Sequence, residues 1–99
     1  MLFIKTHKSY RDVIAICDSK LVGKKFEEDI FQLDVKENFY KGEKVDEKEA
    51  VRIMQRMSKE DATFNIVGNK SINAAIKAGI ITKEGIKKVH NIPFALVLL

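Results

Sequence analysis

The sequence predicts an α+β domain of two layers, in which a mostly antiparallel sheet carries two main helices on one face. Short β-branched and apolar runs near both ends of the chain are typical of strands, and two amphipathic segments in the second half are typical of helices. The chain has 99 residues, 45% of them hydrophobic, which is enough for one small core. We therefore expect a single domain over residues 1–99.

The first half of the chain contains mainly strands. Residues 2–6 and 12–18 are rich in β-formers and are separated by a polar turn, which predicts an opening hairpin. Residues 31–35 alternate apolar and polar side chains, as a strand with one buried face does. Residues 36–44 are interpreted as a loop held by the aromatic rings of Phe39 and Tyr40, and the pattern of residues 20–30 assigns no element.

The first helix is expected from about Glu47 to Met57. Asp46 is a good N-cap, and Glu49 stands three residues further on to complete a capping box. Apolar residues follow one face of this helix, and the opposite face carries the basic residues Lys48, Arg52, Arg56 and Lys59.

The rest of the chain is expected to alternate strand, helix and strand. Residues 63–67 form a strand, residues 70–78 form a helix that stops at Gly79, and residues 92–99 form the last strand. If both strands lie parallel in one sheet, this segment is a right-handed β-α-β crossover.

Charge is distributed unevenly along the chain, whose net charge is +4. Residues 27–49 sum to −5, while residues 1–26 sum to +4 and residues 50–99 to +5. Such a separation favours a positive face that attracts phosphates or an acidic partner, although ordinary solubilising charges give the same pattern. No apolar run approaches the ~20 residues of a membrane span, and no secretory leader is recognised, so we expect a cytoplasmic protein with no membrane partner.

The turn after the strand at 63–67 is the most informative local motif. Glycine leads there into a helix whose first amides have no partner within the helix, and such amides bind anions, most simply phosphate. The alternative is that Asn69 or Ser71 only caps the helix and Gly68 only permits the turn. The candidate anion or ligand-binding residues are Asn65, Gly68, Asn69, Lys70, Ser71 and Lys77.

No catalytic constellation is evident. The single cysteine, Cys17, lies in an apolar strand, and its spacing from His7 and His90 matches no metal or nucleophile signature. The Gly68 turn has neither the phosphate-loop nor the dinucleotide fingerprint. We assign no catalytic residue, no metal and no cofactor, and a binding role is favoured over an enzymatic one.

Several short strings resemble, in their order and spacing, a family of small archaeal proteins known as domain of unknown function 424. The strings are Cys17-Asp18, Leu21-x-Gly23-Lys24-Lys25-Phe26, Phe39-Tyr40-x-Gly42, Asn65-Ile66-Val67-Gly68 and a late Pro93. The family carries no established activity, so the resemblance implies a cytoplasmic archaeal protein and no reaction.

Three functional hypotheses follow. The first is a non-catalytic module, with translation as its setting, that contacts RNA, a ribonucleoprotein or another phosphate-bearing partner through the basic second half. The second is a protein or enzyme that binds a phosphorylated metabolite at the Gly68-Asn69 turn, with Asn65 and Asp18 as polar groups. The third is a protein-interaction domain, such as a homodimer, that pairs through an exposed C-terminal strand at residues 92–99.

Overall fold

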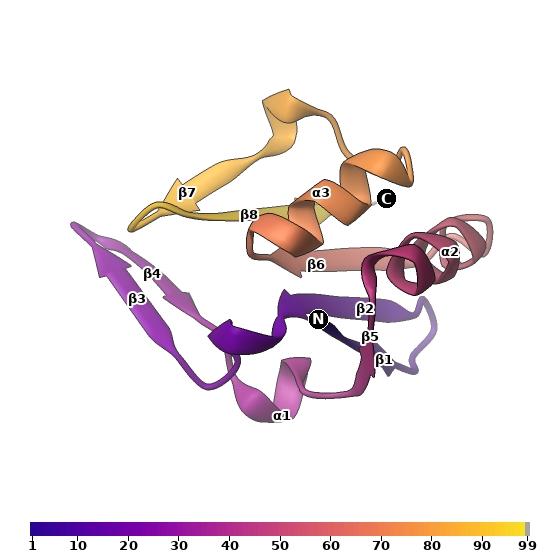
Figure 1. The fold of residues 1–99 in the computed structure, drawn as a ribbon, viewed down its shortest axis with the longest axis horizontal. Coiled ribbons are helices and arrows are strands. Elements are labelled where there is room, and N and C mark those ends of the chain that lie inside the picture. The colour runs from indigo at the N-terminus through magenta and orange to yellow at the C-terminus, as the bar shows by residue number, and fades with distance from the viewer. Residues whose placement is uncertain (99) are drawn as a thin grey trace.

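A six-stranded sheet in the order β5-β1-β2-β6-β8-β7 forms the centre of the computed structural model, which describes residues 1–98 (Figure 1). Its strands are β1 (Leu2–His7), β2 (Val13–Asp18), β5 (Glu43–Val45), β6 (Thr63–Val67), β7 (Lys87–Val89) and β8 (Ile92–Val97). A separate hairpin consists of β3 (Lys25–Glu28) and β4 (Phe31–Asp34). The helices are α1 (Glu37–Tyr40), α2 (Glu47–Ser58) and α3 (Asn69–Lys77), and 3-10 turns lie at Ser19–Leu21 and Lys83–Gly85.

The predicted α+β class and the mainly antiparallel sheet are confirmed, with β2 and β6 as the parallel pair. The condition set for a crossover from β6 to β8, that the two strands run parallel, is not met, because β6 and β8 are antiparallel. The chain instead crosses over through α3 into β7, which runs in the same direction as β6. It then reverses at His90 and Asn91, both with positive φ, and β8 returns between the two.

The C-terminal strand β8 lies inside the sheet. It pairs with β6 on one side and, over Ile92–Phe94, with β7 on the other. The expectation of an exposed C-terminal strand is therefore wrong for Ile92–Phe94. From Ala95 to Val97 the described pairing is with β6 alone, and Leu96 is 58% exposed. The last residue of the predicted strand, Leu99, lies outside the described residues.

The two faces of the sheet are covered differently. Helices α2 and α3 pack on one face, where Ile14, Ile16, Phe64 and Ile66 are at most 1% exposed. The other face is covered by α1 and by the β3–β4 hairpin, which projects from the body of the molecule (Figure 1). Residues in the predicted loop 36–44 thus form α1 and the edge strand β5, and residues 25–28 form a strand that the pattern did not assign.

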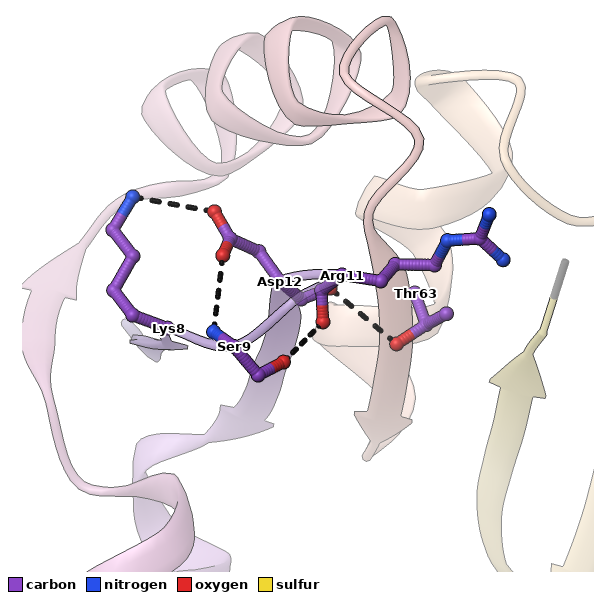
Figure 2. A network of polar contacts seen from close by, with 5 residues as sticks. All are labelled: Lys8, Ser9, Arg11, Asp12 and Thr63. Carbon is purple, nitrogen blue, oxygen red and sulfur yellow. Dashed lines mark hydrogen bonds and ion pairs between the residues drawn. The ribbon is translucent and has the colours of Figure 1, made fainter.

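A polar network at the β1–β2 turn fixes the register of the parallel pair (Figure 2). The Asp12 carboxylate accepts from Lys8 Nζ at 3.2 Å and from the Ser9 amide at 3.4 Å. The Asp12 carbonyl accepts from the Thr63 amide at 2.9 Å and lies 3.5 Å from the Thr63 hydroxyl. This link places Val13 opposite Thr63, so β2 and β6 end side by side at Cys17 and Val67.

Candidate functional site

The carboxyl ends of β2 and β6 bring Asp18 next to Gly68. The two strands are parallel neighbours, and each is followed at once by a change of direction. In sheets with parallel strands, ligands commonly bind outside these carboxyl ends. The pair therefore defines the first candidate site.

The Asp18 carboxylate caps α3. Its Oδ2 atom accepts from the Lys70 amide at 3.1 Å, and its Oδ1 atom accepts from both the amide and the hydroxyl of Ser71, each at 2.8 Å. Ser71 is completely buried, so the carboxylate satisfies a polar side chain that water does not reach. The negative charge also complements the positive end of the helix dipole.

Gly68 makes this cap possible. Its φ of 107° and ψ of 156° lie in a region that residues with a Cβ avoid. A Cβ atom built there would lie 2.4 Å from Cγ of Asp18. The Gly68 amide donates to the Pro93 carbonyl at 2.8 Å, so the residue also ties the turn to β8.

A cleft of about 200 Å³ opens beside this cap. Lys20 and Lys70 provide two cations in its lining, and both residues are exposed. Asn69, also exposed, lines the cleft at the first position of α3. Pro93 of β8 also lines the cleft, and exposed Lys88 is its partner in the β7–β8 ladder. The rim of the cleft is therefore cationic, while the carboxylate inside it is engaged.

The structure brings together four of the six predicted ligand residues, Gly68, Asn69, Lys70 and Ser71. Asn65 lies in the middle of β6, opposite Ala15 and Leu96, and does not line the cleft. Lys77 lies at the far end of α3, where its Nζ atom is 2.6 Å from Glu47 Oε1 of α2. These two residues were grouped wrongly with the turn.

The expectation that the first amides of the helix face an external anion is wrong for Lys70 and Ser71, because Asp18 occupies both. Neither of the proposed local caps is used, since the cap comes from a residue 52 and 53 positions earlier. Asp18 was named only as a polar group for a ligand. The available signal was an acidic residue directly after a buried strand, which matters only once that strand is known to neighbour β6.

The basic residues of α2 form a different surface. Lys48 and Arg52 line a hollow beside the edge strand β5, together with Glu43, Asp46 and Glu49. Arg52 pairs with Glu49. Arg56 and Lys59, also on α2 or its cap, are exposed. The predicted basic stripe thus exists as a helix face, but acids balance its first half, and Lys70 lines a separate cleft.

Cys17 and Tyr40 are both buried in the apolar cluster on the face of the sheet that α1 covers. Burial, reinforced by the Asp18 charge, raises the pKa of the Cys17 thiol to about 12. Burial, reinforced by Cys17, likewise raises the pKa of Tyr40 to about 12. A thiol held protonated in this way is a poor nucleophile and a poor metal ligand. No group of three metal-binding side chains occurs within residues 1–98.

No helix among the described residues has the length and apolar character that crossing a membrane requires.

The comparisons with known proteins agree with the resemblance seen in the sequence. A crystal structure of an uncharacterized conserved protein from the archaeon Methanopyrus kandleri has the same fold, with a TM-score of 0.88 and 20% sequence identity. The match covers 97% of this chain and 89% of that one. No curated protein matches the sequence. The pattern of a family described as protein of unknown function (DUF424) matches residues 6–99, and the chain therefore belongs to this family.

Proposed function

We propose that the protein is a non-catalytic binding module that holds a phosphate group of an RNA at the cleft between Asp18 and Gly68. The observation that carries the proposal is the charge arrangement of this cleft. Lys20 and Lys70 are both exposed in its lining, whereas Asp18, the acid among the lining residues that the structure describes, accepts three hydrogen bonds from α3. An anion at the rim therefore meets two free ammonium groups and an already compensated carboxylate.

Asp18 also decides where the phosphate sits. A phosphate on the amides of Lys70 and Ser71 would have to displace a carboxylate that also satisfies the buried Ser71 hydroxyl. Binding at the rim needs no such displacement. We place the phosphate between the ammonium groups of Lys20 and Lys70, beside the side chain of Asn69.

The size of the cleft favours part of a larger ligand over an enclosed metabolite. Small-molecule pockets usually measure about 300–1,000 Å³, whereas this cleft measures about 200 Å³. It accommodates one phosphate and its immediate neighbours and leaves the rest of the ligand outside. A polymer with many phosphates can bind through such a shallow site, because the binding free energies of its several contacts add.

The non-catalytic part of the proposal is supported by the state of the reactive side chains. The Cys17 thiol is buried and its pKa is raised. His7 is hydrogen bonded to the Phe39 carbonyl, and His90 stacks on Phe26 of the projecting hairpin. The hydroxyl that is paired with a carboxylate at the cleft, that of Ser71 with Asp18, is completely buried and water does not reach it.

Fluorescence anisotropy of a labelled single-stranded RNA, measured over a series of salt concentrations, tests the proposal. We expect binding at low ionic strength that weakens as salt is added. The double variant Lys20→Gln/Lys70→Gln removes both cations that hold this one phosphate, so the slope of log affinity against log salt should become shallower by about 0.7.

The matched control is the double variant Lys48→Gln/Lys59→Gln, which removes the same charge from α2. It should leave the slope unchanged if the cleft is the site. Equal losses in the two double variants would indicate unspecific attraction, and an absence of binding at low salt would remove the proposal. Stabilisation by a phosphorylated metabolite but not by RNA would favour the metabolite-binding alternative.

A further inference from the structure

A second hollow, of about 640 Å³, lies on the opposite face of the sheet from α2 and α3. It is lined by β1, the end of β4 and α1, and it shares no residue with the cleft at Gly68. Its size falls within the usual range for small-molecule sites. The residues used below are Lys5, His7, Asp34, Lys36, Asn38 and Phe39.

Two aromatic rings in this hollow are held in a fixed orientation. The rings of His7 and Phe39 stack with their centroids 4.4 Å apart and their planes 15° apart. His7 Nε2 lies 2.8 Å from the Phe39 carbonyl oxygen, and because that oxygen only accepts, Nε2 donates. Buried Tyr40 packs edge-on against Phe39 at 5.0 Å. The rings are therefore ordered before any ligand arrives, which lowers the entropy cost of stacking a further ring.

Charged groups surround these rings. Lys36 is exposed, and Lys5 donates to the Asn38 carbonyl at 2.7 Å, which occupies one of its three hydrogens. Asp34 contributes a carboxylate to the lining. The hollow thus combines a stacking surface, cations for a phosphate, and an acceptor for the edge of a base.

We propose that this hollow binds a nucleotide unit, with the base stacked on the His7–Phe39 pair and the phosphate held by Lys36. Stacking on aromatic rings beside basic residues is how proteins hold unpaired bases. The nucleotide is either free or part of an RNA strand, and both present the same chemistry to these residues.

Asp34 gives the site a preference among bases. A carboxylate only accepts hydrogen bonds, so it selects a base that presents donors. Guanine presents two adjacent donors on its Watson–Crick edge, the ring N–H and the exocyclic amino group, whereas uracil presents only one. Guanosine monophosphate should therefore bind more tightly than uridine monophosphate, on the order of tenfold, since each missing hydrogen bond leaves a polar group unpaired.

Proton NMR of the histidine rings tests the site directly, because the chain has two histidines and only one lies in the hollow. Saturable addition of guanosine monophosphate should shift the His7 ring protons upfield through the ring current of the stacked base. His90 lies on the β7–β8 turn and does not line the hollow, so it serves as the internal control and should not move. Equal shifts at both histidines, no shift at His7, or the same shift with inorganic phosphate alone would overturn the proposal.

Variants separate stacking from charge. Phe39→Leu keeps an apolar side chain but removes the ring, and should weaken nucleotide binding on the order of tenfold. Phe39→Tyr keeps the ring and should retain binding, so a loss in the leucine variant alone is not explained by misfolding. Lys36→Gln should weaken nucleotide binding, whereas the control Lys59→Gln at the end of α2 should not. If Phe39→Leu binds as the unchanged protein does, the stacking proposal fails.

Two further arms identify the source of the nucleotide and isolate this proposal from the preceding one. A short guanine-containing RNA that binds more tightly than the mononucleotide indicates a strand, and equal affinity indicates a free nucleotide. The Lys20→Gln/Lys70→Gln variant should keep the His7 shift, because the cleft and the hollow share no residue. A lost shift in that variant would contradict an independent site.

Discussion

An aspartate carboxylate caps the first turn of both α2 and α3, but one aspartate is adjacent to its helix in the sequence and the other is distant from it. Asp46 precedes α2 directly and accepts from the Glu49 amide at 2.9 Å, three residues further on. Asp18 comes from the end of β2 and accepts from Lys70 and Ser71 of α3. The first cap is local and exposed, whereas the second exists only after β2 has paired with β6.

The difference has an energetic consequence. When an exposed cap is lost, water replaces the missing acceptor, and the cost is about 1 kcal/mol. When the partner of a buried donor is lost, the donor stays unsatisfied and costs about 1–3 kcal/mol. The Ser71 hydroxyl and amide are in the second situation, so the distant cap of α3 should contribute more to stability than the local cap of α2.

The largest effect is expected for Gly68→Ala. The new Cβ would lie 2.4 Å from Asp18 Cγ, and the backbone would keep a conformation that favours glycine. Strain and displacement of the cap together should lower the free energy of unfolding by about 4 kcal/mol. Denaturant titration measures this value, and Gly85→Ala is the control, because a Cβ there meets nothing within 4 Å. Equal stabilities of the two variants would show that the close approach of Asp18 and Gly68 is not required.

The next effect separates the two caps directly. Asp18→Ala should cost about 3 kcal/mol, since it leaves the buried Ser71 donors unpaired, and Asp46→Ala should cost about 1 kcal/mol. Both values come from denaturant unfolding of the full chain. If Asp46→Ala is the more costly substitution, the distance along the chain and the burial of the cap do not determine its contribution.

The same contrast explains what the sequence predicted. The start of α2 was predicted correctly because Asp46, Glu49 and the apolar stripe that follows are all within one helix. The predicted helix at residues 70–78 was also close to the observed α3 (Asn69–Lys77), because the apolar side chains of this segment recur with helical spacing. The cap of α3 was not predicted, because it depends on which strand lies beside β6, and no local pattern contains that information.

Long-range pairing also accounts for the errors in the sheet and the site. The crossover was assigned to β8 because its six residues form the clearest late strand, whereas β7 has only three residues and two of them are lysines. Lys77 was assigned to the anion site by its helical position relative to Lys70, although Glu47 of α2 lies beside it. The hollow around His7 joins β1 to α1 across more than 30 residues, so only the aromatic pair at 39 and 40 was visible beforehand.

The smallest effect concerns the charge of Asp18, which also influences the core. Cys17 has an ordinary pKa of 9.0 that rises to about 12 in the folded protein, first through burial and second through Asp18. A raised folded pKa means that stability is complete below pH 9 and falls as the pH rises toward 12, because the unfolded thiol ionises first. Tyr40 acts in the same direction above pH 10.

Asp18→Asn should therefore reduce the loss of stability between pH 9 and pH 12, mainly at the upper end of this range, because it removes the second cause of the raised pKa of Cys17. The reduction should be the smaller part of the total loss, because burial is the larger cause of the raised pKa and Asp18 the second. The measurement compares the pH dependence of unfolding in Asp18→Asn with that in Asp46→Asn, so that the loss of a cap charge is common to both. Asp46 does not contribute to the shifts of Cys17 and Tyr40, so its variant should lose stability with pH as the unchanged protein does. Identical profiles for the two variants would mean that the distant cap acts on α3 alone and has no electrostatic effect on the strand that carries it.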